Sequence, residues 1–64
     1  MAAMRAPCVG RCRARWDYKA EYPGELEFNE GDVIEIIERV DETWWHGRIR
    51  GRAGMFAVSY VEEV

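Results

Sequence analysis

The residues that could carry out catalysis are few, and their spacing does not fit it. His46 is the single histidine and Ser59 the single serine, and neither stands at the spacing of a nucleophile with its base or of paired metal ligands. Carboxylates are plentiful, but 64 residues leave little room for a closed pocket that would raise the pKa of one above its neighbour's. Cys8 and Cys12 are interpreted as a tail thiol and a small core residue, because a bridge between them would restrain little and structural zinc needs four ligands. We predict a protein that is not an enzyme and uses no metal or cofactor.

The aromatic side chains indicate binding instead. There are more large rings than the interior of so short a chain can hold, so several must lie at the surface, where exposed aromatic patches usually bind a partner. These residues are Trp16, Tyr18, Tyr22, Trp44, Trp45 and Tyr60. Trp44 and Trp45 are adjacent, and in a strand they would point to opposite faces, so that one packs and the other is displayed.

The charge is concentrated in the middle of the chain. The net charge is −3, but residues 17–42 carry ten acidic residues against Lys19 and Arg39, a net charge of −8. Such a segment repels phosphate and attracts cations, so nucleic acid is an unfavourable partner and a peptide bearing lysine or arginine a suitable one. The alternative, an acidic face that is merely solvated, fits the charge pattern equally well.

Glycine and proline recur at short intervals along the chain, which predicts short strands in one all-β domain. We expect strands at residues 12–17, 33–40, 44–49, 52–56 and 60–64. Residues 33–40 also fit a helical spacing, but their richness in valine and isoleucine favours a strand with Ile34 and Ile36 inward. Arg50 and Gly51 predict a tight β-hairpin, and residues 18–31 a long irregular loop anchored by Leu26 and Phe28.

The sequence also predicts the boundaries of the folded domain and the cellular compartment. Residues 1–11 are expected to form a flexible tail and residues 12–64 the folded domain, which closes into a small five-stranded barrel. The first eleven residues contain no apolar stretch as long as a signal peptide's core, and the longest uncharged run, residues 53–61, is less than half of a membrane span. We therefore expect a cytoplasmic protein with reduced cysteines.

The motifs and their order resemble a known family. They are ARWDY at 14–18, GELEF at 24–28, EGDVIEI at 30–36, WWHG at 44–47, GRAGMF at 51–56 and SYV at 59–61. Together they resemble a Src homology 3 domain over residues 12–64. The resemblance implies a five-stranded barrel-like β fold. It also implies a non-catalytic adaptor module that binds proline-rich P-x-x-P peptides, within a larger signalling, scaffold or cytoskeletal protein.

The resemblance also assigns roles to individual residues. Trp16, Tyr18 and Tyr60 would wall two proline pockets, and their hydroxyl and indole groups would donate hydrogen bonds to peptide carbonyls. Trp44 would separate these pockets from a third, in which a lysine or arginine of the peptide meets acidic residues. Those acidic residues are Glu21 and Glu25, with Asp41 and Glu42 beside them.

Three positions depart from the family's usual pattern, and the first is Trp16, which replaces the first tyrosine of the usual A-L-Y-D-Y, with Arg15 in place of its apolar neighbour. Ala57 stands where proline is usual, which makes one pocket wider or shallower, and Ser59 replaces an asparagine, which removes an amide donor. Ala57 in place of the proline ring favours an alternative in which an atypical domain of the same fold binds a folded partner or an intramolecular segment through its loops and acidic face. A second alternative is a methyl-lysine cage of Trp16, Tyr18 and Trp44. As an isolated domain the chain is expected to be a monomer.

Overall fold

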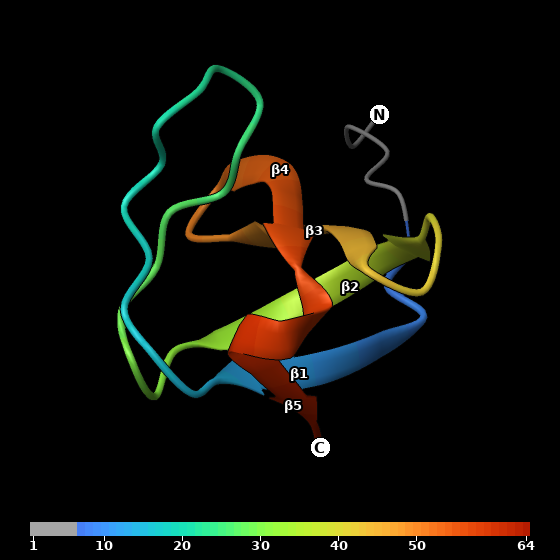
Figure 1. The fold of residues 1–64 in the computed structure, drawn as a ribbon. Coiled ribbons are helices and arrows are strands. Elements are labelled where there is room, and N and C mark those ends of the chain that lie inside the picture. Colours follow the sequence, from blue (N-terminus) through green and yellow to red (C-terminus); the bar gives the residue numbers. More distant parts are fainter. Residues whose placement is uncertain (1–6) are drawn as a thin grey trace.

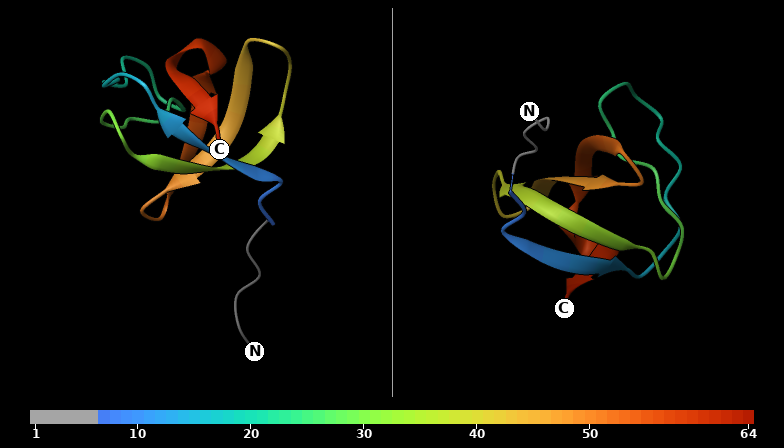
Figure 2. Two further views of the ribbon diagram at one scale, coloured as in Figure 1. Left: turned by 90° about the horizontal axis from the view of Figure 1, so that it is seen from below. Right: turned by 180° about the vertical axis from the view of Figure 1, so that it is seen from behind.

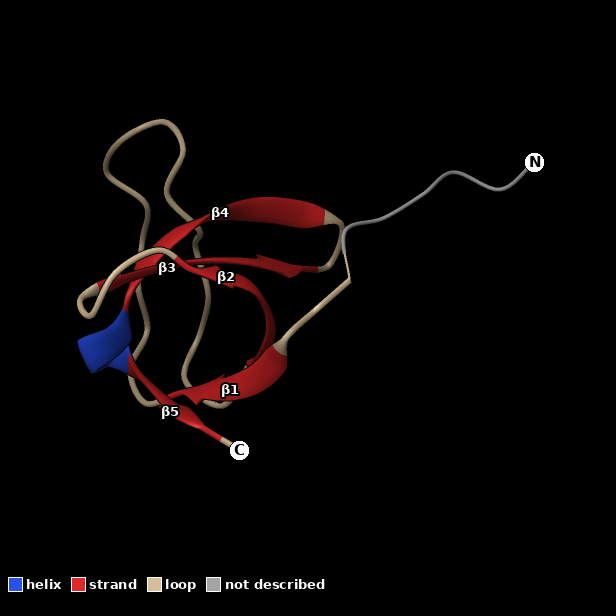
Figure 3. Ribbon diagram, turned by 90° about the vertical axis from the view of Figure 1, so that its right-hand side faces the viewer, coloured by secondary structure: helices blue, strands red, loops and turns tan. Residues whose placement is uncertain are grey.

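The computed structural model describes residues 7–64 as a single five-stranded antiparallel sheet in the order β4-β3-β2-β1-β5 (Figure 1). Its elements are β1 (Gly10–Ala14), β2 (Val33–Arg39), β3 (Trp44–Ile49), β4 (Arg52–Ala57), the 3-10 turn η1 (Val58–Tyr60) and β5 (Val61–Glu63). The strands curl around one interior, and η1 closes the side between β4 and β5 (Figure 3). The prediction of a small all-β barrel-like fold is confirmed, and the described residues contain no helix long and apolar enough to cross a membrane.

The core is built from alternate residues of these strands. Ile34 and Ile36 are fully buried, whereas Val33 before them is exposed and Glu35 between them is half-buried, which is the two-residue period of a strand. The strand prediction for this segment, against the helical alternative, is therefore correct. The buried set is Cys12, Ala14, Leu26, Phe28, Ile34, Ile36, Ile49, Phe56 and Val61.

The predicted bounds of the first and last strands and of the tail differ from those in the structure. β1 begins at Gly10 and ends at Ala14, so the expected strand at 12–17 starts too late and runs too far. Val9 N donates to Ile36 O at 2.7 Å, and the tail expected at 1–11 therefore overlaps the sheet; its residues 1–6 lie outside the described part of the chain. The last strand is shorter than the expected 60–64, because Tyr60 belongs to η1.

The β3–β4 hairpin closes as its sequence predicts. Arg50 has φ 51° and Gly51 has φ 77°, two successive left-handed residues of the kind that a two-residue hairpin matching the sheet twist requires. Cross-strand pairing then runs unbroken from Ile49 with Arg52 to Trp44 with Ala57. This regular ladder fixes the position of Trp44 relative to the start of η1.

The long segment between β1 and β2 lies beside β4 in every view (Figures 1 and 2). As predicted, Leu26 and Phe28 anchor it in the core. Leu26 N donates to Met55 O at 2.9 Å and Met55 N donates to Gly24 O at 2.8 Å, so the loop covers the edge of β4. Tyr18 and Phe28 exchange backbone hydrogen bonds of 2.8 and 3.0 Å, which close the base of the loop.

The two thiols lie in different surroundings. Cys12 is fully buried, and burial, reinforced by the nearby charge of Glu63, raises the pKa of its thiol to about 11. Cys8 is only half-buried. We therefore expect Cys8 to react with an alkylating reagent in the native protein, while Cys12 reacts only as fast as the domain opens, because the thiolate is the reactive form. Mass spectrometry of timed alkylation tests this, and equal rates for both thiols would contradict it.

Candidate functional site

Two tyrosines from distant parts of the chain meet beside the core. Their rings, Tyr18 and Tyr60, lie 5.3 Å apart between centroids at 79°, and both side chains are half-buried. Arg15 N donates to Tyr60 O at 2.7 Å, which ties the end of β1 to η1 and sets this distance. The structure thus brings together two of the three residues that the sequence assigned to the proline pockets.

Trp16, the third predicted wall residue, does not share that cluster. It follows the end of β1, is 57% exposed, and makes no ring contact within residues 7–64. Ser59, in η1, is also exposed, directly before Tyr60. Both side chains are therefore accessible, but neither is fixed by packing in the free protein.

Trp44 and Trp45 divide between the two faces of β3, as predicted. Trp45 packs edge-on against Phe56, with ring centroids 6.3 Å apart, and the guanidinium of Arg39 lies 5.2 Å from its ring. Trp44 is 39% exposed and is the Cα partner of Ala57, the residue that precedes η1. Val58 N donates to Thr43 O at 2.9 Å and further ties η1 to the turn before Trp44. The displayed tryptophan therefore stands on β3, beside the end of β4 that leads into η1 and Tyr60.

Glu25 holds the long loop in shape. Its Oε1 accepts hydrogen bonds from the Tyr18 hydroxyl at 2.8 Å, from Glu21 N at 2.9 Å and from Tyr22 N at 3.2 Å. These donors, the amide of Glu21 foremost, lower the pKa of the Glu25 carboxyl. Glu25 therefore stays ionised, and its Oε2 makes no hydrogen bond within residues 7–64.

Asp41 does the same for the turn before β3. Its Oδ1 accepts hydrogen bonds from Thr43 N, Thr43 Oγ1 and Trp44 N at 2.8, 3.0 and 2.8 Å, and these lower the pKa of its carboxyl. Glu21 and Glu42 are exposed and have no side-chain partner within residues 7–64. The four predicted acidic residues thus divide into two that hold turns and two whose carboxylates are unpaired.

The contact between Tyr18 and Glu25 gives a pH-dependent signature. The hydrogen bond to the carboxylate, with burial second, raises the pKa of Tyr18 to about 12. Because this folded value exceeds the ordinary value of about 10, the contact stabilises the fold below pH 10 and is lost as the pH rises towards 12. In an NMR pH titration we expect Tyr18 to ionise at about 12 in the parent chain and at a lower pH in Glu25→Gln. Ionisation of Tyr18 near pH 10 in both proteins would contradict the contact.

The chain matches a family of small β domains. The family model described as "SH3 domain" matches residues 13–57. The chain belongs to the SH3 domain family. SH3 domains are non-catalytic interaction modules, and within residues 7–64 no histidine, cysteine and carboxylate side chains gather into a group that could hold a metal ion.

Curated relatives carry the same module inside longer proteins. A class E vacuolar protein-sorting machinery protein of Emericella nidulans is 46% identical over 59 residues, which is 92% of this chain and 10% of that protein. A protein of the same description from Mycosarcoma maydis is 46% identical over 63 residues, 97% of this chain and 11% of the relative. This chain therefore spans about a tenth of the length of these relatives.

Solved SH3 domains superpose on the whole barrel. The C-terminal SH3 domain of myosin IB from Entamoeba histolytica has a TM-score of 0.83 at 37% identity, covering 92% of this chain and 98% of that domain. An SH3 domain from a Saccharomyces cerevisiae protein, solved in complex with a peptide, has a TM-score of 0.81 at 38% identity, covering 91% of this chain and all of that domain.

The turn-holding roles of Glu25 and Asp41 were missed by sequence reasoning. For Asp41 a signal is present, because an aspartate two residues before a threonine is typical of an Asx turn that caps following backbone amides. For Glu25 no local signal exists, since its contact with Tyr18 joins residues seven apart across an irregular loop. The Tyr18 hydroxyl donates to Glu25 and so cannot at the same time donate to a peptide carbonyl, as the sequence-based hypothesis had it.

Proposed function

We propose that this SH3 domain binds proline-rich P-x-x-P peptides carrying a lysine or arginine, in the polyproline II conformation, along the surface that joins Tyr18, Tyr60 and Trp44. The observation that carries the proposal is the half-buried Tyr18–Tyr60 pair, linked through η1 to an exposed Trp44. Peptide-bound SH3 domains among the structural relatives support it.

The geometry suits a polyproline II ligand, which has three residues per turn and leaves its carbonyls unpaired. Tyr18 and Tyr60 present rings between which proline can pack, and the Tyr60 hydroxyl has no partner within residues 7–64. Tyr60 and the indole N–H of Trp44 are therefore the proposed donors to peptide carbonyls. Trp16 and Ser59 are both exposed, and we propose that they complete the walls of the proline pockets when a peptide binds. Ala57, the cross-strand partner of Trp44, leaves the pocket beside it wider than a proline ring would.

The acidic residues supply the preference for a basic ligand. Glu21 and Glu42 present unpaired carboxylates from the two loops on either side of the proposed third pocket, and Glu25 adds its Oε2. Asp41 acts on the ligand through Trp44, whose backbone amide it holds. Because exposed ion pairs are individually weak, this pocket directs the peptide's orientation more than it raises its affinity.

The experiment that tests the proposal is a titration of the isotope-labelled chain with an arginine-containing P-x-x-P peptide, followed by two-dimensional NMR. Saturable shifts of the Trp44 indole N–H and of the Tyr60 and Glu21 amides are expected, with a Kd in the micromolar range or weaker. No shift at millimolar peptide, with the spectrum of a folded protein, would overturn it. That result would favour the alternative in which the loops and acidic face bind a folded partner or an intramolecular segment, which Ala57 in place of a proline favours.

The division of the acidic residues makes a separate prediction. Glu21→Gln and Glu42→Gln are each expected to weaken an arginine-containing peptide about two- to fivefold and to leave its arginine-free counterpart within about twofold, because only the ion pair is lost. Glu25→Gln is expected to weaken both peptides, because it also releases the loop amides and Tyr18. Isothermal titration calorimetry with the peptide pair measures this. Equal losses for both peptides in Glu42→Gln would remove its charge role.

The setting of the domain is proposed from its relatives. We infer that the chain is the SH3 module of a larger adaptor in protein sorting, acting as a monomeric domain on the cytoplasmic side of membranes. Support comes from the curated relatives described as vacuolar protein-sorting machinery, of which the matched segment is about a tenth. Gel filtration and light scattering of the isolated chain test the monomeric state.

A further inference from the structure

A second surface lies at the end of β3 opposite Trp44. It is an open depression of about 410 Å³, here called the outer depression, formed by β1, β2, β3 and the β3–β4 turn. The residues that line it include Arg11, Asp32, Val33, Glu35, Arg48 and Arg50. β3 has six residues, so the depression is roughly 17 Å from Trp44 along the strand. None of its residues belongs to the proposed peptide surface.

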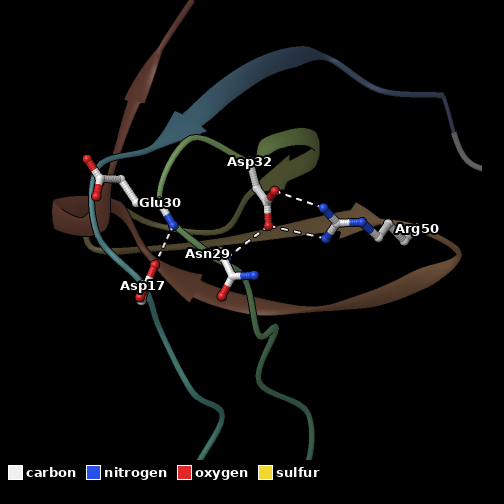
Figure 4. A network of polar contacts seen from close by, with 5 residues as sticks. All are labelled: Asp17, Asn29, Glu30, Asp32 and Arg50. Atoms are coloured by element: carbon white, nitrogen blue, oxygen red, sulfur yellow. Dashed lines mark hydrogen bonds and ion pairs between the residues drawn. The ribbon is translucent and has the colours of Figure 1, made fainter.

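Two of its arginines are held rigidly by carboxylates. Arg48 Nε donates to Glu35 Oε1 at 2.6 Å, and the Arg48 side chain is only 14% exposed. Arg50 donates to both carboxylate oxygens of Asp32 at 2.9 and 3.2 Å, and Asp32 also accepts from Asn29 N (Figure 4). The bidentate contact orients Arg50, and burial beside Glu35 orients Arg48, so these two pairs fix the walls of the depression.

β1 adds two further arginines to this face. Arg11 faces outward opposite Glu35, and Arg13 faces outward between Val33 and Glu62. Neither arginine has a hydrogen bond or ion pair within residues 7–64. Five arginines, namely Arg11, Arg13, Arg48, Arg50 and Arg52, thus stand on this face against Asp32, Glu35 and Glu62, a net charge of +2 in a chain whose total is −3.

The depression also offers an apolar contact. Val33, at the start of β2, is 44% exposed and lies among the arginines, although the rest of the apolar residues of β1 and β2 are buried or half-buried. We propose that the outer depression is a docking site for an acidic peptide segment, in which an aliphatic side chain packs on Val33 and the flanking carboxylates bind Arg11 and Arg13.

Charge complementarity selects this occupant. Two unpaired guanidiniums on one strand are matched by two carboxylates at strand spacing, and bidentate arginine–carboxylate pairs are the strongest contacts such a surface can make. The carboxylates of Asp32 and Glu35 inside the depression disfavour a polyphosphate, because its charge is denser than that of a peptide and it has no aliphatic group to pack on Val33. Because the site lies apart from Trp44, the domain can bind a basic proline-rich ligand and an acidic ligand at the same time.

The test uses the full 64-residue chain and a short blocked peptide with two glutamates on each side of a leucine. NMR titration at low salt is expected to give saturable shifts at the amides of Arg11, Val33 and Arg48 and none at the Trp44 indole. Arg11→Gln and Arg13→Gln are each expected to weaken binding about three- to fivefold, and Val33→Ser at least twofold. Raising the salt concentration is expected to weaken binding further.

Lys19→Gln is the matched control, because it removes one exposed positive charge from the long loop, away from the depression. It is expected to bind the acidic peptide as the parent chain does. Trp44→Lys is also expected to bind the acidic peptide normally while losing the proline-rich peptide, so the two proposals can fail independently. Equal weakening by Lys19→Gln and Arg11→Gln, or no saturable shift, would overturn the inference. So would tighter binding of tripolyphosphate or of phosphatidylserine vesicles to the same residues.

Discussion

Gly54→Ala is expected to destabilise the domain by about 3 kcal/mol or more, because the added methyl group has no room against the long loop. A Cβ at Gly54 would lie 2.8 Å from Leu26 N, 2.9 Å from the Glu25 carbonyl carbon and 2.9 Å from Gly24 O. These are backbone atoms, so they can move away only if the long loop separates from β4. Moving them breaks the two hydrogen bonds to Met55 and exposes Leu26, while the whole domain is stabilised by only about 3–10 kcal/mol.

Urea denaturation followed by tryptophan fluorescence measures this loss. Gly10→Ala is the matched control, because Gly10 is also a strand glycine without positive φ. Its added Cβ would meet Arg39 Nη2 at 3.0 Å and Glu63 Oε2 at 3.1 Å, the ends of two flexible side chains that can shift. Gly10→Ala is expected to change stability by less than about 1 kcal/mol. Similar midpoints for the two variants would show that the loop is not held against β4 as described.

Much of the fold was predictable because it rests on local patterns. The alternation around Ile34 and Ile36, and the Arg50–Gly51 pair with its left-handed backbone, each specify one element from a few neighbouring residues. The ends of β1 were not predictable in this way. Alternation continues from Cys12 through Trp16, but the strand ends at Ala14, because Arg15 N turns to Tyr60 O at the other end of the chain. A strand ends where its partner ends, and the partner is not visible in a local pattern.

The candidate site also has one feature that a local pattern predicts and others that depend on contacts within the folded loop. The exposure of Trp44 follows from strand alternation with Trp45, and the structure shows it. The competition for the Tyr18 hydroxyl and the capping of loop amides by Glu25 depend on how an irregular loop folds back. The family resemblance predicted carboxylates of the long loop beside the aromatic rings, but it could not show which oxygen of Glu25 remains available to a ligand.

Trp44→Lys is expected to weaken a P-x-x-P peptide at least about thirtyfold, because tryptophans at the centre of a small interface commonly contribute 2 kcal/mol or more. The substitution removes the ring between the proposed proline and basic pockets and adds a charge that repels the peptide's arginine. The fold is expected to survive. Trp44 is 39% exposed, and Asp41 holds its backbone amide, a contact that does not depend on the side chain. Calorimetry gives the affinity, and far-ultraviolet circular dichroism with thermal unfolding gives the fold.

Two variants show whether the ring or the added charge causes the loss. Val40→Lys adds the same charge in the same loop, at a side chain that is 47% exposed, and is expected to cost only about two- to threefold in affinity. Trp44→Phe keeps a flat ring but loses the indole N–H, and an intermediate loss is expected. If Val40→Lys weakened the peptide as much as Trp44→Lys, the effect would be electrostatic and Trp44 would not lie in the interface. Binding would then have to run along the acidic loops alone, which is how a folded partner rather than a polyproline ligand would engage this domain.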